Sequence, residues 1–175
     1  GLGIHWVFDP FYSMFLSLRV KELAKTKGKA AHAIFVRNMV GSIKRHGYFT
    51  EATADKKRLD FAGSGNTSAG QIKDGKEKGL FWVRFELNLK EPVDPKSKTF
   101  TYAVYDPTYY IEILHRERKP AYTMDGVSKD VCKAILIKPK PDAAAVTFAA
   151  SLDKTESAGD GLGQLFAEKV ILHCR

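Results

Sequence analysis

Apolar and polar residues alternate along two segments near the middle of the chain. Every second position between 80 and 89 (LFWVRFELNL) is apolar, and most positions between them are charged or polar. This period of two is typical of a half-buried strand. The segment 99–105 (TFTYAVY) is nearly free of charge on both faces, which predicts a strand in the middle of a sheet. Pro92 and Pro95 suit a turn between the two segments. We therefore expect an antiparallel sheet centred on 80–90 and 99–106.

A helical period precedes these strands. Asp9 can cap a helix that has Pro10 at its first position, and two lysines followed by Gly28 suit its end. Apolar residues at a spacing of three to four predict the buried face of this helix: Phe11, Met14, Phe15 and Leu18. A second helix is expected over about 29–45, ending at Gly47, with this buried set: Ala31, Ile34, Phe35, Met39 and Ile43.

The remaining segments complete an α+β pattern. The segments 48–53 and 57–61 predict a hairpin that turns at Asp55 and Lys56, and the glycine-rich segment 62–79 predicts a loop. Three further elements are expected: a strand at 129–138, a helix at 143–152 capped by Asp142, and one helical turn at 164–168 before a last strand. Helices gather in the first half and strands in the second, which favours an α+β fold, an antiparallel β-sheet core with the N-terminal helical hairpin packed on it.

The length of 175 residues suits a single domain over residues 1–175. No run of 18 apolar residues is present, so we expect a chain that does not span a membrane. The segment that begins at Gly1 lacks the basic and apolar regions of a signal peptide and starts almost inside an ordered element. We expect a leader, and with it a first strand, to be absent from this N-terminus.

The net charge of +8 comes from 28 basic and 20 acidic residues. A basic protein invites comparison with nucleic-acid-binding proteins. The lysines and arginines, however, are spread over separate loops near residues 73–78, 116–119 and 138–140, and no nucleic-acid-binding motif accompanies them. We interpret them as solvated loop charges and expect no nucleic-acid partner.

The sequence contains no recognisable catalytic motif. Neither a Ser-His-Asp order, a Cys-His pair at useful spacing nor a His-Glu-x-x-His motif occurs, and the five histidines stand singly. We therefore expect a protein that is not an enzyme. The residues that could carry chemistry are few: Asp9, Tyr12, Asp106, Tyr109 and Tyr110.

Asp106 is the most informative of these candidates. It follows a predicted buried strand, and Pro107 restricts it to an extended conformation. Its carboxylate can cap a turn by accepting the backbone N–H of Thr108 or Tyr109. It can also serve as an oxygen ligand, or as the partner of a ligand, for a transition metal. Both interpretations stay open from the sequence.

Three short segments resemble one protein family. The segments are YDPTYY at 105–110, WVFDPFYS at 6–13 and HGYFT at 46–50. They are similar, in this order, to motifs of the uncharacterised DUF1007 family. Members of that family are labelled periplasmic components of ABC-type transport systems and often lie beside nickel, cobalt or zinc transport genes.

The resemblance implies a function in transport. It suggests a periplasmic binding or accessory protein for transition-metal uptake, with a membrane metal transporter as partner and a divalent metal such as zinc or nickel as cofactor. Asp9 and Asp106 are the metal candidates. The other residues in the matching motifs that could belong to a site are Trp6, Tyr12, Tyr105, Pro107, Tyr109 and Tyr110. The His-Pro-His motif with which many members begin is missing here, so the alternative is a non-catalytic structural or interaction domain that docks on a transporter.

Two cysteines, Cys132 and Cys174, lie in strand-like segments. On their own they are compatible with two free buried thiols. The paired cysteines of the family imply that they form a disulfide, and disulfides persist in oxidising compartments. Such a bond would close a loop of about 40 residues and stabilise the fold by roughly 3–4 kcal/mol. We therefore expect an exported protein.

Overall fold

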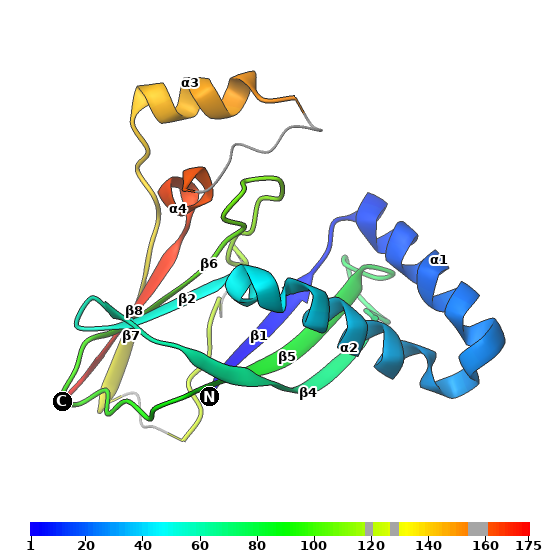
Figure 1. Cartoon of the computed structure of the whole chain (residues 1–175), viewed down its shortest axis with the longest axis horizontal. Coiled ribbons are helices and arrows are strands. Elements are labelled where there is room, and N and C mark those ends of the chain that lie inside the picture. Colours follow the sequence, from blue (N-terminus) through cyan, green and yellow to red (C-terminus); the bar gives the residue numbers. More distant parts are fainter. Residues whose placement is uncertain (118–120, 127–129, 154–160) are drawn as a thin grey trace. The chain divides into compact units, whose positions relative to one another are not determined.

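The structure is a computed structural model that describes residues 1–117, 121–126, 130–153 and 161–175 (Figure 1). The chain divides into two compact units. The first unit comprises Gly1–Arg45 and Phe61–Lys90, and the second comprises His46–Asp60 and Glu91–Arg175. Helices and antiparallel strands occupy separate stretches of the chain, which confirms the α+β prediction. That the two units act as a single domain stays a prediction.

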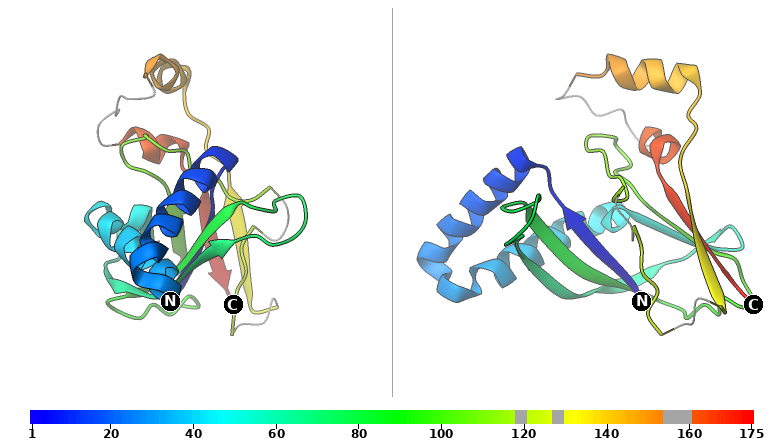
Figure 2. Two further views of the ribbon diagram at one scale, coloured as in Figure 1. Left: turned by 90° about the vertical axis from the view of Figure 1, so that its right-hand side faces the viewer. Right: turned by 180° about the vertical axis from the view of Figure 1, so that it is seen from behind.

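The first unit is a three-stranded antiparallel sheet with two helices on it. Its elements are β1 (Leu2–Val7), α1 (Pro10–Lys27), a short 3-10 turn η1 (Gly28–Ala30), α2 (Ala31–Ser42), β4 (Phe61–Gln71) and β5 (Phe81–Leu89). The strand order is β1-β5-β4. Helix α1 packs against β5 and helix α2 against β4, as Figures 1 and 2 show. The predicted helical hairpin and its packing on a sheet are therefore confirmed.

The core of this unit follows from the period of two in β5. The side chains of Phe81, Val83, Phe85 and Leu87 are fully buried. Opposite them the helices contribute a second set of buried aliphatic residues: Leu16 and Val20 from α1, and Ala31, Val36 and Val40 from α2. Burying a valine, leucine or phenylalanine side chain of this set is worth about 1.5–3 kcal/mol. Of the residues expected inside α2, Ala31 is buried, whereas Ile34, Phe35, Met39 and Ile43 are only partly so.

Strand β4 corrects one prediction. Most of the segment expected as a loop, 62–79, is an eleven-residue strand that pairs with β5 along its length. Small residues gave it no apolar period, so the sequence lacked a strand signal. The close approach of the neighbouring strand explains one glycine, because a Cβ atom on Gly70 would lie 3.0 Å from the indole ring of Trp82. A bulge between Gly65 and Ser68 interrupts the register.

The second unit is built on a five-stranded antiparallel sheet. Its strands are β2 (Thr50–Ala54), β3 (Lys57–Arg58), β6 (Phe100–Val104), β7 (Cys132–Ile137) and β8 (Lys169–Cys174), in the order β3-β2-β6-β8-β7. Two short helices, α3 (Ala143–Ser151) and α4 (Leu162–Phe166), precede β8, and a 3-10 segment η2 (Ile43–Phe49) precedes β2. The hairpin β2–β3 turns at Asp55 and Lys56, which both have positive φ angles, as predicted.

Strands β5 and β6 lie in different sheets, so the expectation of one sheet centred on both is wrong. β5 is flanked by β1 and β4, and β6 by β2 and β8, so each already has backbone partners on both sides. The central position expected for β6 is correct, but its neighbours come from outside the 80–106 segment. The linker with two prolines does not bring β5 and β6 together as a hairpin.

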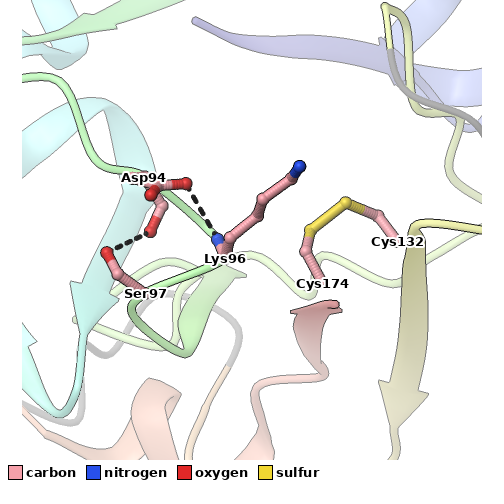
Figure 3. The surroundings of a disulfide bond; sticks show 5 residues. All are labelled: Asp94, Lys96, Ser97, Cys132 and Cys174. Carbon is pink, nitrogen blue, oxygen red and sulfur yellow. Dashed lines mark hydrogen bonds between the residues drawn. A yellow bond between two sulfur atoms is a disulfide. The ribbon is translucent and has the colours of Figure 1, made fainter.

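A disulfide joins Cys132 at the start of β7 to Cys174 at the end of β8 (Figure 3). The two residues are directly opposite in the antiparallel register, with Cα atoms 4.0 Å apart. The expected pairing is therefore present. The same view shows the turn at 94–97, where Asp94 accepts hydrogen bonds from the backbone of Lys96 (3.0 Å) and the hydroxyl of Ser97 (3.1 Å). Lys129, the expected start of β7, lies outside the described residues.

Candidate functional site

Asp106 lies at the end of β6 in the second unit and is only 5% exposed. Its Oδ1 accepts hydrogen bonds from the backbone N–H (2.9 Å) and the hydroxyl (2.7 Å) of Thr108. Its Oδ2 accepts from the backbone N–H groups of Tyr110 and Ile111, both at 3.2 Å. An ionised carboxylate has about four lone-pair sites. Four donors therefore fill its acceptor capacity, as expected for a carboxylate that caps a turn.

The turn is held against α4 by a close backbone contact. A Cβ atom added to Gly163 would overlap the carbonyl oxygen of Asp106, so only glycine fits at this position. The rings of Tyr109 and Phe166 pack with centroids 4.7 Å apart, and the N–H of Gly161 donates to the carbonyl of Pro107 (3.3 Å). The cavity beside the turn measures only about 10 Å³, less than most ligands need.

These contacts weigh against a metal at Asp106. A metal ion would have to displace the N–H and O–H donors that hold the turn, and those part-buried donors would then lose their partners. Asp9, the other metal candidate, caps α1 by accepting the N–H of Tyr12 at 3.0 Å and lies in the first unit. A cation shared by Asp9 and Asp106 stays a prediction.

The structure reveals a buried polar pair that sequence reasoning missed. Glu168 is 5% exposed, and its Oε2 accepts the backbone N–H of His115 and lies 3.0 Å from Nδ1 of the same residue. The ring of Tyr102 lies 6.0 Å from the imidazole. His115 stood among surface charges and gave no signal of its own. A signal was present at Glu168, because a carboxylate between Ala167 and Val170 in a buried segment requires a partner.

The pKa values of two tyrosines are raised, those of Tyr102 in β6 and of Tyr105 directly after it. Burial, with a smaller contribution from Tyr122, raises the pKa of Tyr102 to about 12. Burial also raises the pKa of Tyr105, as does the hydrogen bond that its hydroxyl donates to Glu51 at 2.7 Å. Both side chains are therefore neutral donors at physiological pH. The remaining motif residues differ in their surroundings. The indole ring of Trp6 packs against the ring of Phe85, whereas the side chain of Tyr110 is exposed.

The outer face of α1 is the second notable feature, and it corrects the predicted burial of this helix. The residues expected inside are the exposed ones: Phe11 75%, Met14 58%, Phe15 47% and Leu18 57%. The buried side of α1 consists instead of Ser13, Leu16 and Val20. The Ser13 hydroxyl accepts the N–H of Phe81 (2.8 Å) and donates to the carbonyl of Phe8 (3.1 Å), so a polar residue supports the contact with β5.

A groove runs beside this exposed face. It has a volume of about 380 Å³ and is lined by α1, the end of β4 and the residues before β5. Met14 and Leu18 are among its apolar lining residues, and Lys21 and Lys78 line it as well. We call the four exposed residues Phe11, Met14, Phe15 and Leu18 the α1 face.

The net charge of the protein resides in the unit that carries the α1 face. The first unit contains thirteen lysines and arginines against five acidic residues, which gives +8. The second unit contains fifteen of each and is neutral. The basic residues are thus spread in sequence, as expected, but their surplus is confined to one unit.

The described residues offer neither a metal-binding cluster nor a membrane-spanning helix. No group of three or more His, Cys, Asp and Glu side chains placed to hold a metal ion occurs in residues 1–117, 121–126, 130–153 and 161–175. Within the same part of the chain, no helix combines the length and the apolar character needed to cross a membrane.

Fold and site together define an α+β protein of two antiparallel sheets, with a disulfide in one sheet and, on the other, a helix that has an exposed apolar face. The chain belongs to the DUF1007 family of proteins of unknown function, which matches residues 1–174. It is 27% identical over 177 residues to an uncharacterised protein of Haemophilus influenzae, a match that covers 99% of this chain and 81% of that protein. No solved structure matches it. The family expected from the sequence is therefore confirmed.

Proposed function

We propose that the protein is a non-catalytic interaction domain, exported to the periplasm, that acts at a membrane as an accessory to a transporter. The exposed α1 face carries this proposal. Monomeric proteins rarely expose a large contiguous apolar patch without using it for contact with a partner or a membrane. The disulfide between Cys132 and Cys174 supports export, because such bonds persist in oxidising compartments.

The polar groups of the second unit support the non-catalytic part of the proposal. Asp106 is used as a turn cap, Tyr105 donates to Glu51, and His115 contacts Glu168. A catalytic carboxylate or imidazole has to reach a substrate, usually from a cleft. Here the cavity beside Asp106 is nearly filled.

Binding to native membrane vesicles tests the proposal. The full chain with its disulfide intact should sediment with the vesicles, and the double variant Phe15→Gln, Leu18→Gln should bind at least tenfold more weakly, since it removes two apolar contacts of about 1.5 kcal/mol each. The matched control is Val146→Gln, Phe148→Gln, which changes two exposed apolar residues of α3 in the neutral unit. Equal binding of all three proteins would contradict a docking role for α1.

Transition-metal uptake is a second candidate, and the His115–Glu168 pair favours it. Histidines that bind metals usually donate a hydrogen bond from one ring nitrogen to a carboxylate or carbonyl, and the other ring nitrogen binds the metal. Nδ1 of His115 faces Glu168 in this way, so Nε2 is the nitrogen that would bind zinc or nickel.

Calorimetric titration with Zn²⁺ and Ni²⁺ tests this second candidate. Binding should weaken at least tenfold in His115→Gln and be unchanged in His173→Gln, which alters an exposed histidine of β8 in the same unit. Heat of binding that is absent in the full chain, or present and equal in both variants, would count against His115 as a ligand.

A further inference from the structure

We propose that the α1 face binds a membrane surface that carries anionic lipid headgroups. This inference rests on the proposed docking role, because it uses the same face, and it adds the chemistry of the partner. The apolar side chains of the face would enter the boundary between headgroups and acyl chains, and the surrounding cations would contact lipid phosphates.

The geometry of α1 suits a helix lying flat on a membrane. Its buried residues Ser13, Leu16 and Val20 attach it to the sheet of the first unit, so its orientation is fixed by packing. The α1 face lies on the opposite side of the same turns, since residues three and four apart share a face. Phe11 and Phe15 present two aromatic rings there, and Tyr12 continues the row, with its ring 5.8 Å from that of Phe15.

Cations border this face. The guanidinium carbon of Arg19 lies 5.9 Å from the centroid of the Phe15 ring, and Lys21 lines the groove together with Lys78. Long basic side chains can extend their charged ends toward headgroups while their stems lie along apolar surface. Lys25, one turn further on, lies 2.6 Å from Glu22, the only acidic residue of α1.

The distribution of charge selects an anionic partner. The whole +8 surplus belongs to the first unit, and each basic residue near an anionic membrane surface strengthens binding about fivefold. Helix α3 offers the internal comparison: Val146 and Phe148 are also about half exposed, but they lie in a unit without net charge. Both α1 and α3 expose apolar side chains. Of these two helices, only α1 does so in a unit with a surplus of positive charge.

Co-sedimentation with protein-free vesicles tests the inference. Vesicles of phosphatidylcholine mixed with phosphatidylglycerol should bind the full chain, and pure phosphatidylcholine vesicles should bind it at least tenfold more weakly. The variant Met14→Gln, Phe15→Gln, Leu18→Gln should lose at least tenfold in binding to the mixed vesicles. Lys21→Gln, Lys78→Gln should lose about 25-fold, at about fivefold for each charge.

Matched controls separate this effect from general hydrophobicity and charge. Val146→Gln, Phe148→Gln on α3, and Lys138→Gln, Lys140→Gln on the neutral unit, should bind the mixed vesicles like the unmodified chain. Added salt should weaken binding, because it screens the exposed charges. Circular dichroism of each variant checks that the fold is retained.

The possible results distinguish the inference from the docking proposal. No binding to anionic vesicles, or binding that the α1 variants leave unchanged, overturns the lipid inference. In that case, the chain can still bind native vesicles through the α1 face. If protease treatment of the native vesicles abolishes this binding, a protein partner occupies the α1 face and the docking role stands. If native vesicles also bind independently of α1, both proposals fail.

Discussion

The two units of this protein stabilise a small antiparallel sheet in different ways. The first unit covers its three strands with two helices and places four fully buried side chains of β5 beneath them. The second unit has a five-stranded sheet, a disulfide and buried polar contacts around Asp106 and Glu168. The first has an apolar core and exposes an apolar, basic surface, while the second directs several of its polar groups inward.

This difference separates the residues that stabilise the fold from those available to a partner. Of the carboxylates and tyrosines singled out in the sequence, Asp106 and Tyr105 form hydrogen bonds inside the second unit, and Asp9 caps α1 in the first unit. The surface that could contact a partner is the α1 face, which the sequence assigned to the core. Experiments that perturb one unit at a time can test whether this division holds.

The largest effect is expected from the disulfide. The variant Cys132→Ala, Cys174→Ala opens a loop of 42 residues and should lower the free energy of unfolding by about 4 kcal/mol. Denaturant unfolding measures the loss. Hydrogen exchange should show β7 and β8 losing protection while β1, β4 and β5 keep theirs. Equal loss in both sheets would instead show that the two units unfold together as a single domain.

Gly163→Ala should cost about 3 kcal/mol, because its Cβ atom would overlap the carbonyl of Asp106 and α4 would have to move. Gly41→Ala, in α2 of the first unit, is the matched control, since nothing lies within 4 Å of its added Cβ atom. Alanine is the better helix former, so this control should be neutral or stabilise by up to about 1 kcal/mol. Thermal denaturation of both proteins measures the contrast, and equal midpoints would argue against the close contact at Asp106.

Much of the fold could be predicted from the sequence where one local rule dominated. The period of two in β5, the Asp9 and Asp142 caps, and the hairpin turn at 55–56 each rest on neighbouring residues. Strand β4 could not be found in this way, because its glycines and serines gain their conformation from pairing with β5. The separation of β5 from β6 depends on strands far away in the sequence, which no local pattern encodes.

The prediction of which side of α1 is buried was wrong for a related reason. The helix has apolar residues on two sides, and periodicity alone cannot tell which side meets the sheet. The structure selects the side of Leu16 and Val20, where Ser13 is small enough to approach the backbone of Phe81. The Asp106 turn was better determined, since a carboxylate before proline was expected to cap it, although Tyr110 and Ile111 replace Tyr109 among its donors.

Substituting the two carboxylates by their amides should sharpen the contrast between the units. In Asp106→Asn the amide nitrogen would face two part-buried N–H or O–H donors, and we expect a loss of about 2 kcal/mol. In Asp9→Asn one oxygen still accepts the N–H of Tyr12, and asparagine caps helices as well as aspartate, so the change should be about zero. Urea unfolding measures both. A larger loss of unfolding free energy in Asp9→Asn than in Asp106→Asn would show that Asp9 contributes more to the stability of the fold.

Alkaline pH should weaken the second unit through its partly buried Tyr102. The pKa of Tyr102 is about 12 in the folded protein and about 10 in an unfolded chain, so folding favours the protonated form. This contribution to stability is complete below pH 10 and is lost as the pH rises from 10 to 12. Unfolding measured across that range should depend less on pH in Tyr102→Phe. An unchanged pH dependence would show that this phenol titrates normally.

The smallest effect is expected at the α1 face and gives the most direct test of which side of α1 is buried. Leu18→Gln replaces an exposed side chain with one of similar helix propensity, so the free energy of unfolding should change by no more than about 0.5 kcal/mol. Leu16→Ala, two residues earlier on the buried side, should cost about 2–4 kcal/mol because it leaves a cavity against β5. Denaturant unfolding of the two variants decides the matter. If Leu18→Gln proved the more damaging change, the helix would be turned as its sequence first indicated, and the α1 face would belong to the core instead of a partner.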